Sequence, residues 1–182
     1  RVIVTDVLED EGAVVAAEIN ASGGTAEFHT LDVTSTAAAE AVLASVHANH
    51  GPLAALVCNA GIAHKVPLEE LTDEKWDHTF EIDLKGMIRV IRPVVAQMKL
   101  VGGGAIVCLS SIMGVAYGWD QHVHYSAAKS GVIGLVRGLG VELARNNIRV
   151  NGVAPGYIRT AQALSTIHSL GPEGLEKAAD FI

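Results

Sequence analysis

Basic residues are scarce in this chain: 13 lysines and arginines stand against 20 aspartates and glutamates, so the formal net charge is −7. Proteins that bind nucleic-acid backbones or anionic membranes carry basic patches, so this balance argues against both kinds of partner. No uninterrupted apolar run reaches the ~18 residues that suggest a membrane span. The sequence therefore predicts no nucleic acid and no membrane among the partners.

Cysteine is also scarce, and its two copies, Cys58 and Cys108, both stand in apolar, strand-like runs. Buried free thiols are typical of a reducing compartment, which predicts a cytoplasmic protein, with a disulfide as the alternative. Among the eight histidines, His122 and His124 alternate, but no cluster of carboxylates or cysteines joins them. No metal site is therefore expected.

Apolar residues make up 49% of the 182 residues, enough for the core of one domain. Their pattern alternates between strand-like and helix-like segments, which predicts an α/β fold with a parallel sheet and helices on both faces. Strands are expected at 1–6, 26–31, 54–58, 105–109 and 148–153. Helices are expected at 9–21, 35–50, 72–100 and 124–147, with a bend at Pro93 and a helical flap over 161–182.

Tyr125 and Lys129 stand four residues apart in a helix-forming run, so their side chains project from one face. A nearby ammonium favours the phenolate, which makes tyrosine a usable acid and base towards an alcohol or ketone. Ser111 follows a strand-like segment upstream, and its hydroxyl can hold the reacting oxygen. The trio suits hydride transfer to a nicotinamide, although the spacing alone also fits a tyrosine packed on a lysine stem.

Six segments together resemble the short-chain dehydrogenase/reductase family, of the small single-domain type. That type includes 3-oxoacyl-acyl-carrier-protein reductases and many sugar, steroid and cyclic-alcohol dehydrogenases. The matching segments are 31–34, 58–62, 106–111, 125–129, 148–151 and 155–160. The resemblance implies a Rossmann-like doubly wound parallel sheet and an oxidoreductase that acts on the CH–OH group of a small alcohol or ketone.

The glycine-rich turn that brings backbone amides to a dinucleotide pyrophosphate is missing. Gly23 and Gly24 follow a helix, and the glycines at 102–104 precede a strand. The resemblance places the family's first strand between 1–6 and 54–58, and a further strand after the flap. The chain is therefore expected to be a fragment, incomplete at both ends, in which residues 1–182 form a partial NAD(P)-binding domain that binds cofactor poorly.

Asp6 ends the first strand, where the resemblance places the residue that contacts the adenosine ribose. A carboxylate there accepts hydrogen bonds from the ribose hydroxyls and repels a 2′-phosphate, so NAD is favoured over NADP. The alternative is that Asp6 only caps the next turn. Further cofactor contacts implied by the resemblance are Asp32, Val33, Asn59, Ala60, Gly61, Tyr125, Lys129, Pro155, Gly156, Ile158 and Thr160.

The resemblance also assigns catalytic roles. Tyr125 is the expected general acid and base, Lys129 lowers its pKa and binds the nicotinamide ribose, and Ser111 orients the substrate oxygen. Strand alternation is expected to send Ser110 to the other face. Asp83 stands where the family often has an asparagine in a water-linked proton relay, and its charge should raise the pKa of Tyr125. An NAD-binding or oligomeric protein that has lost the chemistry is the alternative.

The loop over 112–124 contains Met113, Tyr117, Trp119 and His122, which favours an apolar or cyclic substrate, with plain loop packing as an equal alternative. The helices at 72–100 and 124–147 are apolar on more than one side, and the second is rich in alanine and glycine. In the family these helices often pair across a two-fold axis, which implies a homodimer or homotetramer. The alternative is that the small residues of the helix at 124–147 serve its packing against the sheet.

Overall fold

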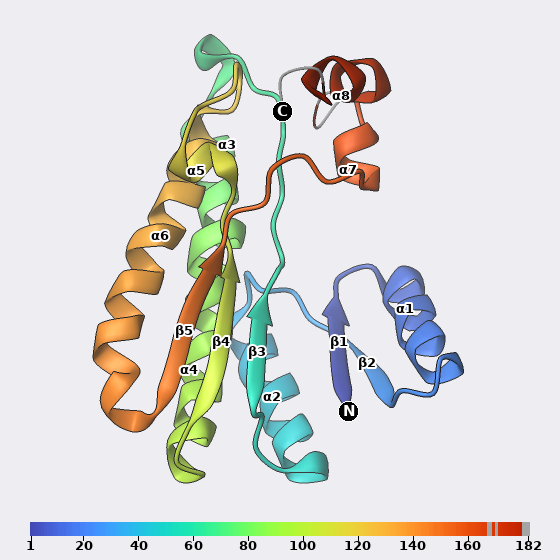
Figure 1. Ribbon diagram of the computed structural model, residues 1–182, viewed down its shortest axis with the longest axis vertical. Helices are drawn as coiled ribbons and strands as arrows, with labels where there is room; N and C mark the ends of the chain where they lie inside the picture. The colour runs from blue at the N-terminus through green and yellow to red at the C-terminus, as the bar shows by residue number, and fades with distance from the viewer. Residues whose placement is uncertain (167–168, 170, 180–182) are drawn as a thin grey trace.

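In the part of the chain that the structure describes, five parallel strands form two sheets (Figure 1). The computed structural model describes residues 1–166, 169 and 171–179. Strand β1 (Val2–Asp6) pairs with β2 (Ala26–Thr30), and β4 (Gly104–Leu109) pairs on its two sides with β3 (Ala55–Cys58) and β5 (Ile148–Val153). Within the described residues no strand pairing joins β1 to β3. The sheet is thus divided at the place where the sequence predicts a further strand.

Helices connect the strands, as the sequence predicts. The longer ones are α1 (Glu9–Ala21), α2 (Thr36–His50), α3 (Asp73–Phe80), α4 (Gly86–Leu100), α6 (Val123–Leu143) and α8 (Gly171–Ala179). Short helical segments are η1 (Leu68–Glu70), η2 (Glu81–Lys85), α5 (Ile112–Val115), η3 (Ala144–Asn146) and α7 (Ala161–Leu164). The predicted flap corresponds to α7 and α8, and its remainder, at 167–168, 170 and 180–182, lies outside the described residues.

Local sequence accounts for several helix ends. Ser35 accepts a hydrogen bond from the backbone of Ala38 at 3.1 Å and so begins α2. Thr72 caps α3 in the same way through Lys75, at 3.4 Å. Gly51 ends α2 with a φ of 81°, a conformation that glycine adopts without a steric penalty.

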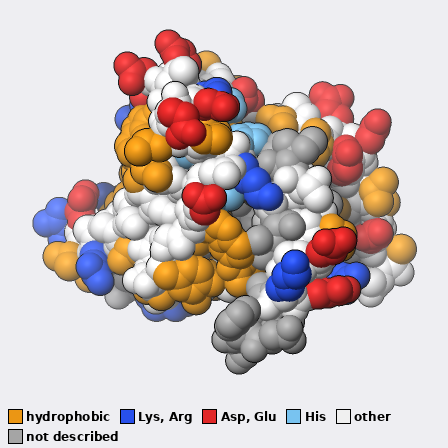
Figure 2. All heavy atoms as spheres, turned by 90° about the horizontal axis from the view of Figure 1, so that it is seen from above, with side chains coloured by type: hydrophobic (Ala, Val, Ile, Leu, Met, Phe, Trp, Pro, Cys, Tyr) orange, Lys and Arg blue, Asp and Glu red, His pale blue; other side chains and the backbone are white. Residues whose placement is uncertain are grey.

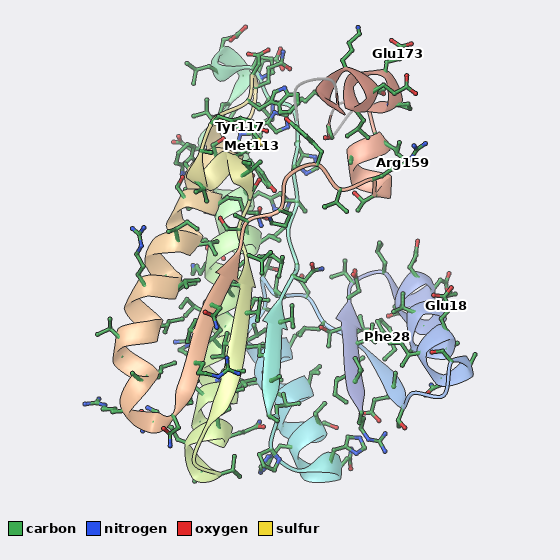
Figure 3. The ribbon with its side chains drawn as sticks, viewed as in Figure 1. Glu18, Phe28, Met113, Tyr117, Arg159 and Glu173 are labelled. Carbon is green, nitrogen blue, oxygen red and sulfur yellow. The ribbon has the colours of Figure 1, made fainter. Side chains whose placement is uncertain are left out.

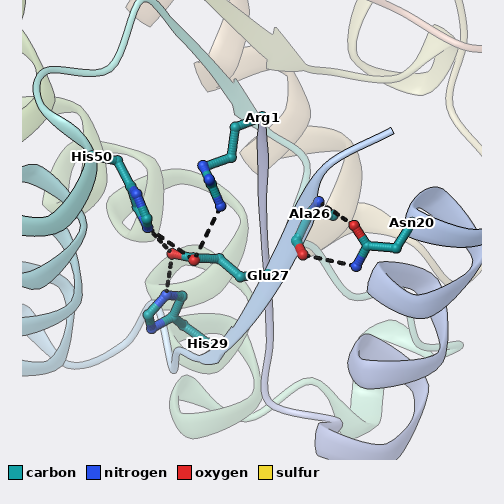
Figure 4. Close-up of polar contacts among 6 residues, drawn as sticks. All are labelled: Arg1, Asn20, Ala26, Glu27, His29 and His50. Atoms are coloured by element: carbon teal, nitrogen blue, oxygen red, sulfur yellow. Dashed lines mark hydrogen bonds and ion pairs between the residues drawn. The ribbon is translucent and has the colours of Figure 1, made fainter. Parts of the chain in front are cut away.

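Residues of β2 alternate between helices on opposite faces of the small sheet. The ring of Phe28 fills the space beside Gly12, where a Cβ would lie 2.0 Å from the ring, and so packs under α1 (Figure 3). The neighbouring Glu27 accepts hydrogen bonds from His29 and His50, at 3.0 and 2.8 Å, and so contacts the end of α2 (Figure 4). The predicted arrangement, a parallel sheet with helices on both faces, is confirmed.

The segment predicted as one helix over 72–100 is interrupted. Between α3 and α4 the chain forms one π-helical turn, Glu81–Lys85, and Pro93 lies farther on, inside α4. The irregularity therefore comes earlier than the proline predicts. A π turn contains one extra residue, which rotates the following side chains relative to a regular helix and often marks a functional site. Here it places Asp83 in the interior.

The main core lies between the three-stranded sheet and the helices α2, α4 and α6. Ile106 and Cys108 of β4 are fully buried in it, together with Val94 and Met98 of α4. Cys58 lies beside Cys108 in the register of β3 and β4, and both thiols are free, which decides against the disulfide. None of the described helices is long and apolar enough to cross a membrane.

Candidate active site

A cavity of about 340 Å³ lies at the carboxyl ends of β3, β4 and β5. Segments that follow these three strands line it together with the first turns of α6. This is the edge of an open parallel sheet where ligands usually bind. Figure 2 looks onto this end of the molecule, where histidine and basic side chains lie near the middle of the view.

Ser111, Tyr125 and Lys129 all border this cavity. Ser111 begins α5, and its hydroxyl accepts a hydrogen bond from the backbone of Met113 at 3.2 Å. Tyr125 lies in the first turn of α6 and Lys129 one turn later, with the lysine Nζ 5.5 Å from the centre of the tyrosine ring. The structure thus brings the three predicted residues together.

A close approach of α5 to α6 fixes this arrangement. At Gly114 a Cβ would lie 2.5 Å from the backbone carbon of Lys129, so only glycine allows α5 to lie this near. Ser130 donates a hydrogen bond to the carbonyl of Gly114 at 3.0 Å. The serine-bearing turn and the tyrosine-bearing helix are therefore held against each other.

The pKa of Tyr125 is raised, contrary to the expectation that Lys129 lowers it. Burial of the phenol is the largest cause, and the charge of Asp83 raises the pKa further, as predicted, while a hydrogen bond with Ser111 acts in the opposite direction. The ammonium of Lys129 lies 5.5 Å from the ring centre of Tyr125 and is paired with the carboxylate of Asp83. In this state the phenol is the stable form of the tyrosine.

Asp83 and Lys129 form a buried ion pair behind the cavity. The carboxylate is fully buried and its Oδ2 lies 3.3 Å from the lysine Nζ. Its Oδ1 accepts a hydrogen bond from the backbone of Ile62 at 2.8 Å, and the lysine also donates to the carbonyl of Leu109 at 3.2 Å. Burial raises the pKa of Asp83, and the charge of Lys129 opposes this. The pair joins the π turn, the loop after β3 and α6.

Residues predicted to contact the cofactor divide into two groups. Asn59, Gly61, Pro155, Gly156, Ile158 and Thr160 border the cavity. Ala60 is exposed and does not border it. Beside Gly61 a Cβ would lie 3.0 Å from the Nζ of Lys129, so a side chain there would press on the ion pair.

The predicted adenosine contacts lie outside the cavity, at the ends of β1 and β2. The carboxylate of Asp6 accepts a hydrogen bond from the backbone of Leu8 at 3.0 Å, so it does cap the turn. Hydrogen bonds from Thr34 lower the pKa of the exposed Asp32. The side chain of Val33 packs against α4 at Gly86, where a Cβ would lie 2.8 Å from a methyl group of Val33.

Ser110, which alternation was expected to send to the other face, lines the same cavity as Ser111, beyond the end of the strand at Leu109. The hydroxyl of Ser110 is buried and donates to the carbonyl of Lys129 at 2.7 Å. It is therefore engaged in holding α6, and Ser111 is the serine with a hydroxyl beside Tyr125.

Lys65 and Tyr157 are among the residues of the cavity wall that were not singled out from the sequence. Tyr157 contacts Trp119 edge-on, with ring centres 5.2 Å apart, and its hydroxyl lies 3.2 Å from that of Tyr117. Lys65 stands in the loop after β3, where only its position beyond the end of a strand could have suggested a role. Tyr157 could have been suspected because it falls between Gly156 and Ile158.

Two histidines flank Tyr125. His122 borders the cavity, and its ring lies edge-on to that of Tyr125, with centres 6.3 Å apart. Its Nδ1 lies 2.7 Å from the carbonyl of Asp120, which identifies Nδ1 as the protonated nitrogen. Burial, with the charges of His122 and His64, lowers the pKa of His124. Within the described residues, no group of three or more potential metal ligands is arranged around a common point.

The profile of the short chain dehydrogenase family matches residues 1–169. Trans-4-hydroxycyclohexanecarboxylate dehydrogenase of Sinomonas cyclohexanicum is 36% identical over 99% of this chain and 71% of its own length. Cis-4-hydroxycyclohexanecarboxylate dehydrogenase of the same organism is 41% identical over 87% of this chain and 64% of its own length.

Among solved structures, a gluconate 5-dehydrogenase from Burkholderia cenocepacia J2315 in complex with NADP and tartrate has a TM-score of 0.82 and 28% identity. The match covers 88% of this chain and 63% of that one. The chain thus spans between roughly three fifths and three quarters of the length of these proteins.

Proposed function

Because this chain belongs to the short chain dehydrogenase family, we propose that the complete protein is an NAD-dependent oxidoreductase for a secondary alcohol or its ketone. The observation that carries the proposal is the convergence of Ser111, Tyr125 and Lys129 on one cavity. These groups can hold a substrate oxygen and move its proton, and the nicotinamide of NAD, when bound, accepts or supplies the hydride.

In the oxidative direction, Tyr125 takes the hydroxyl proton of the alcohol and Ser111 donates a hydrogen bond to the same oxygen. In the reductive direction, Tyr125 returns the proton to the ketone oxygen. Since burial favours the neutral phenol, this tyrosine is prepared for the reductive step and needs added positive charge for the oxidative one. Lys129 supplies that charge to the extent that Asp83 does not cancel it.

Residues at the cavity fit a nicotinamide. Gly156 has open space where a side chain would stand, and Thr160, farther along the segment, borders the same cavity. Asp6 favours NAD over NADP, since one of its carboxylate oxygens caps the turn and the other can accept a hydrogen bond from a ribose hydroxyl. No lysine or arginine stands among Val7, Leu8 and Glu9 to hold a 2′-phosphate.

We propose a cyclic secondary alcohol as substrate. Met113, Trp119 and Tyr157 give the cavity an apolar wall, and two relatives are dehydrogenases of hydroxylated cyclohexane rings.

We also propose a cytoplasmic homo-oligomer. Gly134 and Gly138 on α6 face open space and Val141 is 83% exposed, so one small-residue face of this helix is free for a second copy. Gly131, in contrast, packs against Leu84 within the chain.

Replacement of Tyr125 by phenylalanine tests the chemistry. General acid and base groups contribute ~10²–10⁴-fold, so the complete Tyr125→Phe protein should lose nearly all NADH formation on a panel of secondary alcohols. Tyr117→Phe is the matched control, because its hydroxyl contacts Tyr157 and not the reacting groups. Wild-type turnover by Tyr125→Phe would refute the assignment.

A non-catalytic, NAD-binding protein is the second candidate, because Asp83 faces Lys129 and the pKa of Tyr125 is raised. Calorimetry of NAD binding, combined with assays of turnover, distinguishes the two candidates. The non-catalytic protein would bind NAD but would turn over no alcohol or ketone at any pH.

A further inference from the structure

The cavity wall is positive in a chain that is negative as a whole. Lys65 and Lys129 border the cavity, and no aspartate or glutamate is among the described residues that line it. Since acidic residues outnumber lysines and arginines by 20 to 13, their absence from this wall runs against the composition. The surroundings favour a ligand with negative charge.

The charge of Lys129 is already balanced by Asp83 at 3.3 Å, so the remaining lysine, Lys65, decides the character of the wall. Lys65 is half-buried, and no carboxylate lies within 4.0 Å of its ammonium in the described part of the chain. Its Nζ donates to the carbonyl of Thr166 at 3.1 Å.

Within the described part of the chain, that contact leaves donors of the Lys65 ammonium unused. An ammonium has three N–H donors, and a carbonyl takes up one of them without cancelling the charge. A partly buried charge of this kind is stabilised by an anion that accepts the remaining donors. The bond to Thr166 also connects the loop after β3 to the segment after α7. An anion held by Lys65 therefore lies where these two segments meet over the cavity.

We propose that the substrate is an anionic secondary alcohol, a hydroxy acid whose carboxylate binds to the Lys65 ammonium. The inference rests on the proposed function, because it assumes that the reacting hydroxyl lies at Ser111 and Tyr125. Trp119 and Tyr157, in edge-on contact at 5.2 Å, give an apolar wall for the carbon skeleton between the two polar ends. A ring or short chain with the hydroxyl at one end and the carboxylate at the other suits these surroundings.

The test compares an acid with its neutral analogue in the complete protein. We expect kcat/KM for 4-hydroxycyclohexanecarboxylate to exceed that for its methyl ester. Lys65→Met should lower kcat/KM for the acid by about 10- to 100-fold, the usual worth of a charged hydrogen bond, and leave the ester nearly unchanged. Lys75→Met is the matched control, because the Lys75 ammonium likewise donates to a backbone carbonyl, that of Glu70 at 2.9 Å, but lies outside the cavity.

A binding measurement keeps the inference separate from the chemistry. Cyclohexanecarboxylate has no hydroxyl and cannot react, so its calorimetric affinity for the NAD-loaded protein reports the anion site alone. The inference is supported if Lys65→Met weakens the binding of cyclohexanecarboxylate and Lys75→Met leaves it intact. This holds even if no alcohol is turned over, because a lack of turnover would count only against the proposed function. Equal kcat/KM for the acid and the ester would overturn the inference. A Lys65→Met protein that loses affinity for NAD rather than for the acid would also overturn it, since that result assigns the lysine to a cofactor phosphate.

Discussion

Asp83→Asn should make the protein a better catalyst of alcohol oxidation at low pH. The substitution keeps the shape of the side chain and an oxygen for the backbone N–H of Ile62, which lies 2.8 Å from Oδ1, but it removes the negative charge beside Lys129. Lys129 then exerts its full positive charge on Tyr125. The pKa of Tyr125 falls, because one cause of its raised value, the charge of Asp83, is gone.

The size of the effect follows from the separations. Oδ2 of Asp83 lies 3.3 Å from the lysine Nζ, which lies 5.5 Å from the tyrosine ring centre, so the carboxylate is at most about 9 Å from that centre. At this distance and an effective dielectric constant of about 20, two unit charges interact by about 2 kcal/mol. Since about 1.4 kcal/mol corresponds to ten-fold, kcat/KM for oxidation at a pH on the acid limb should rise by roughly 20- to 30-fold.

The assay is the pH profile of kcat/KM for oxidation by the complete protein. Oxidation needs the phenolate, so the rate rises as pH increases through the pKa of Tyr125, and a lower pKa moves this limb to lower pH. His78, whose charge acts on Asp83, and His122 beside the tyrosine ring are unchanged in the variant. Asp77→Asn removes the same charge from the exposed face of α3 and should leave the limb in place. If the acid limb of the pH profile of Asp83→Asn stays in place or moves to higher pH, the reasoning is refuted.

Two further outcomes concern cofactor and assembly. Asp6→Ser should reduce the preference for NAD over NADP by about ten-fold or more, because it removes a charged acceptor for the ribose and the repulsion of a 2′-phosphate. The ratio of the kcat/KM values with NAD and with NADP measures this preference. Equal kcat/KM with the two cofactors in the unmodified protein would contradict the role of Asp6. Val141→Glu should lower the molar mass in light scattering at micromolar concentration, because it places a charge on the 83% exposed residue of the proposed α6 interface. Leu68→Glu, at a 69% exposed residue of η1, should leave the mass unchanged, and a monomeric unmodified protein would decide against the interface.

Local sequence determined the elements of the fold because their signals lie within a few residues. Ser35 and Thr72 begin helices through bonds to residues three positions on, and Gly51 ends one with a positive φ. Apolar strand segments separated by helices gave the parallel α/β arrangement. The same local information placed Tyr125 and Lys129 on one helix face and suggested Ser111, and the resemblance added six further residues that border the cavity.

Tertiary structure decided the electrostatic state of the site. No local pattern shows that a π turn carries Asp83 into the core against Lys129, because this depends on how η2 and α6 pack. The same packing reverses the expected shift in the pKa of Tyr125 and engages Ser110 with the backbone of α6. Lys65 reaches the cavity wall only because the loop after β3 and the segment after α7 meet there, 101 residues apart in sequence. A charge acts on whatever lies within a few ångströms, so its effect is set by the fold rather than by neighbours in the chain.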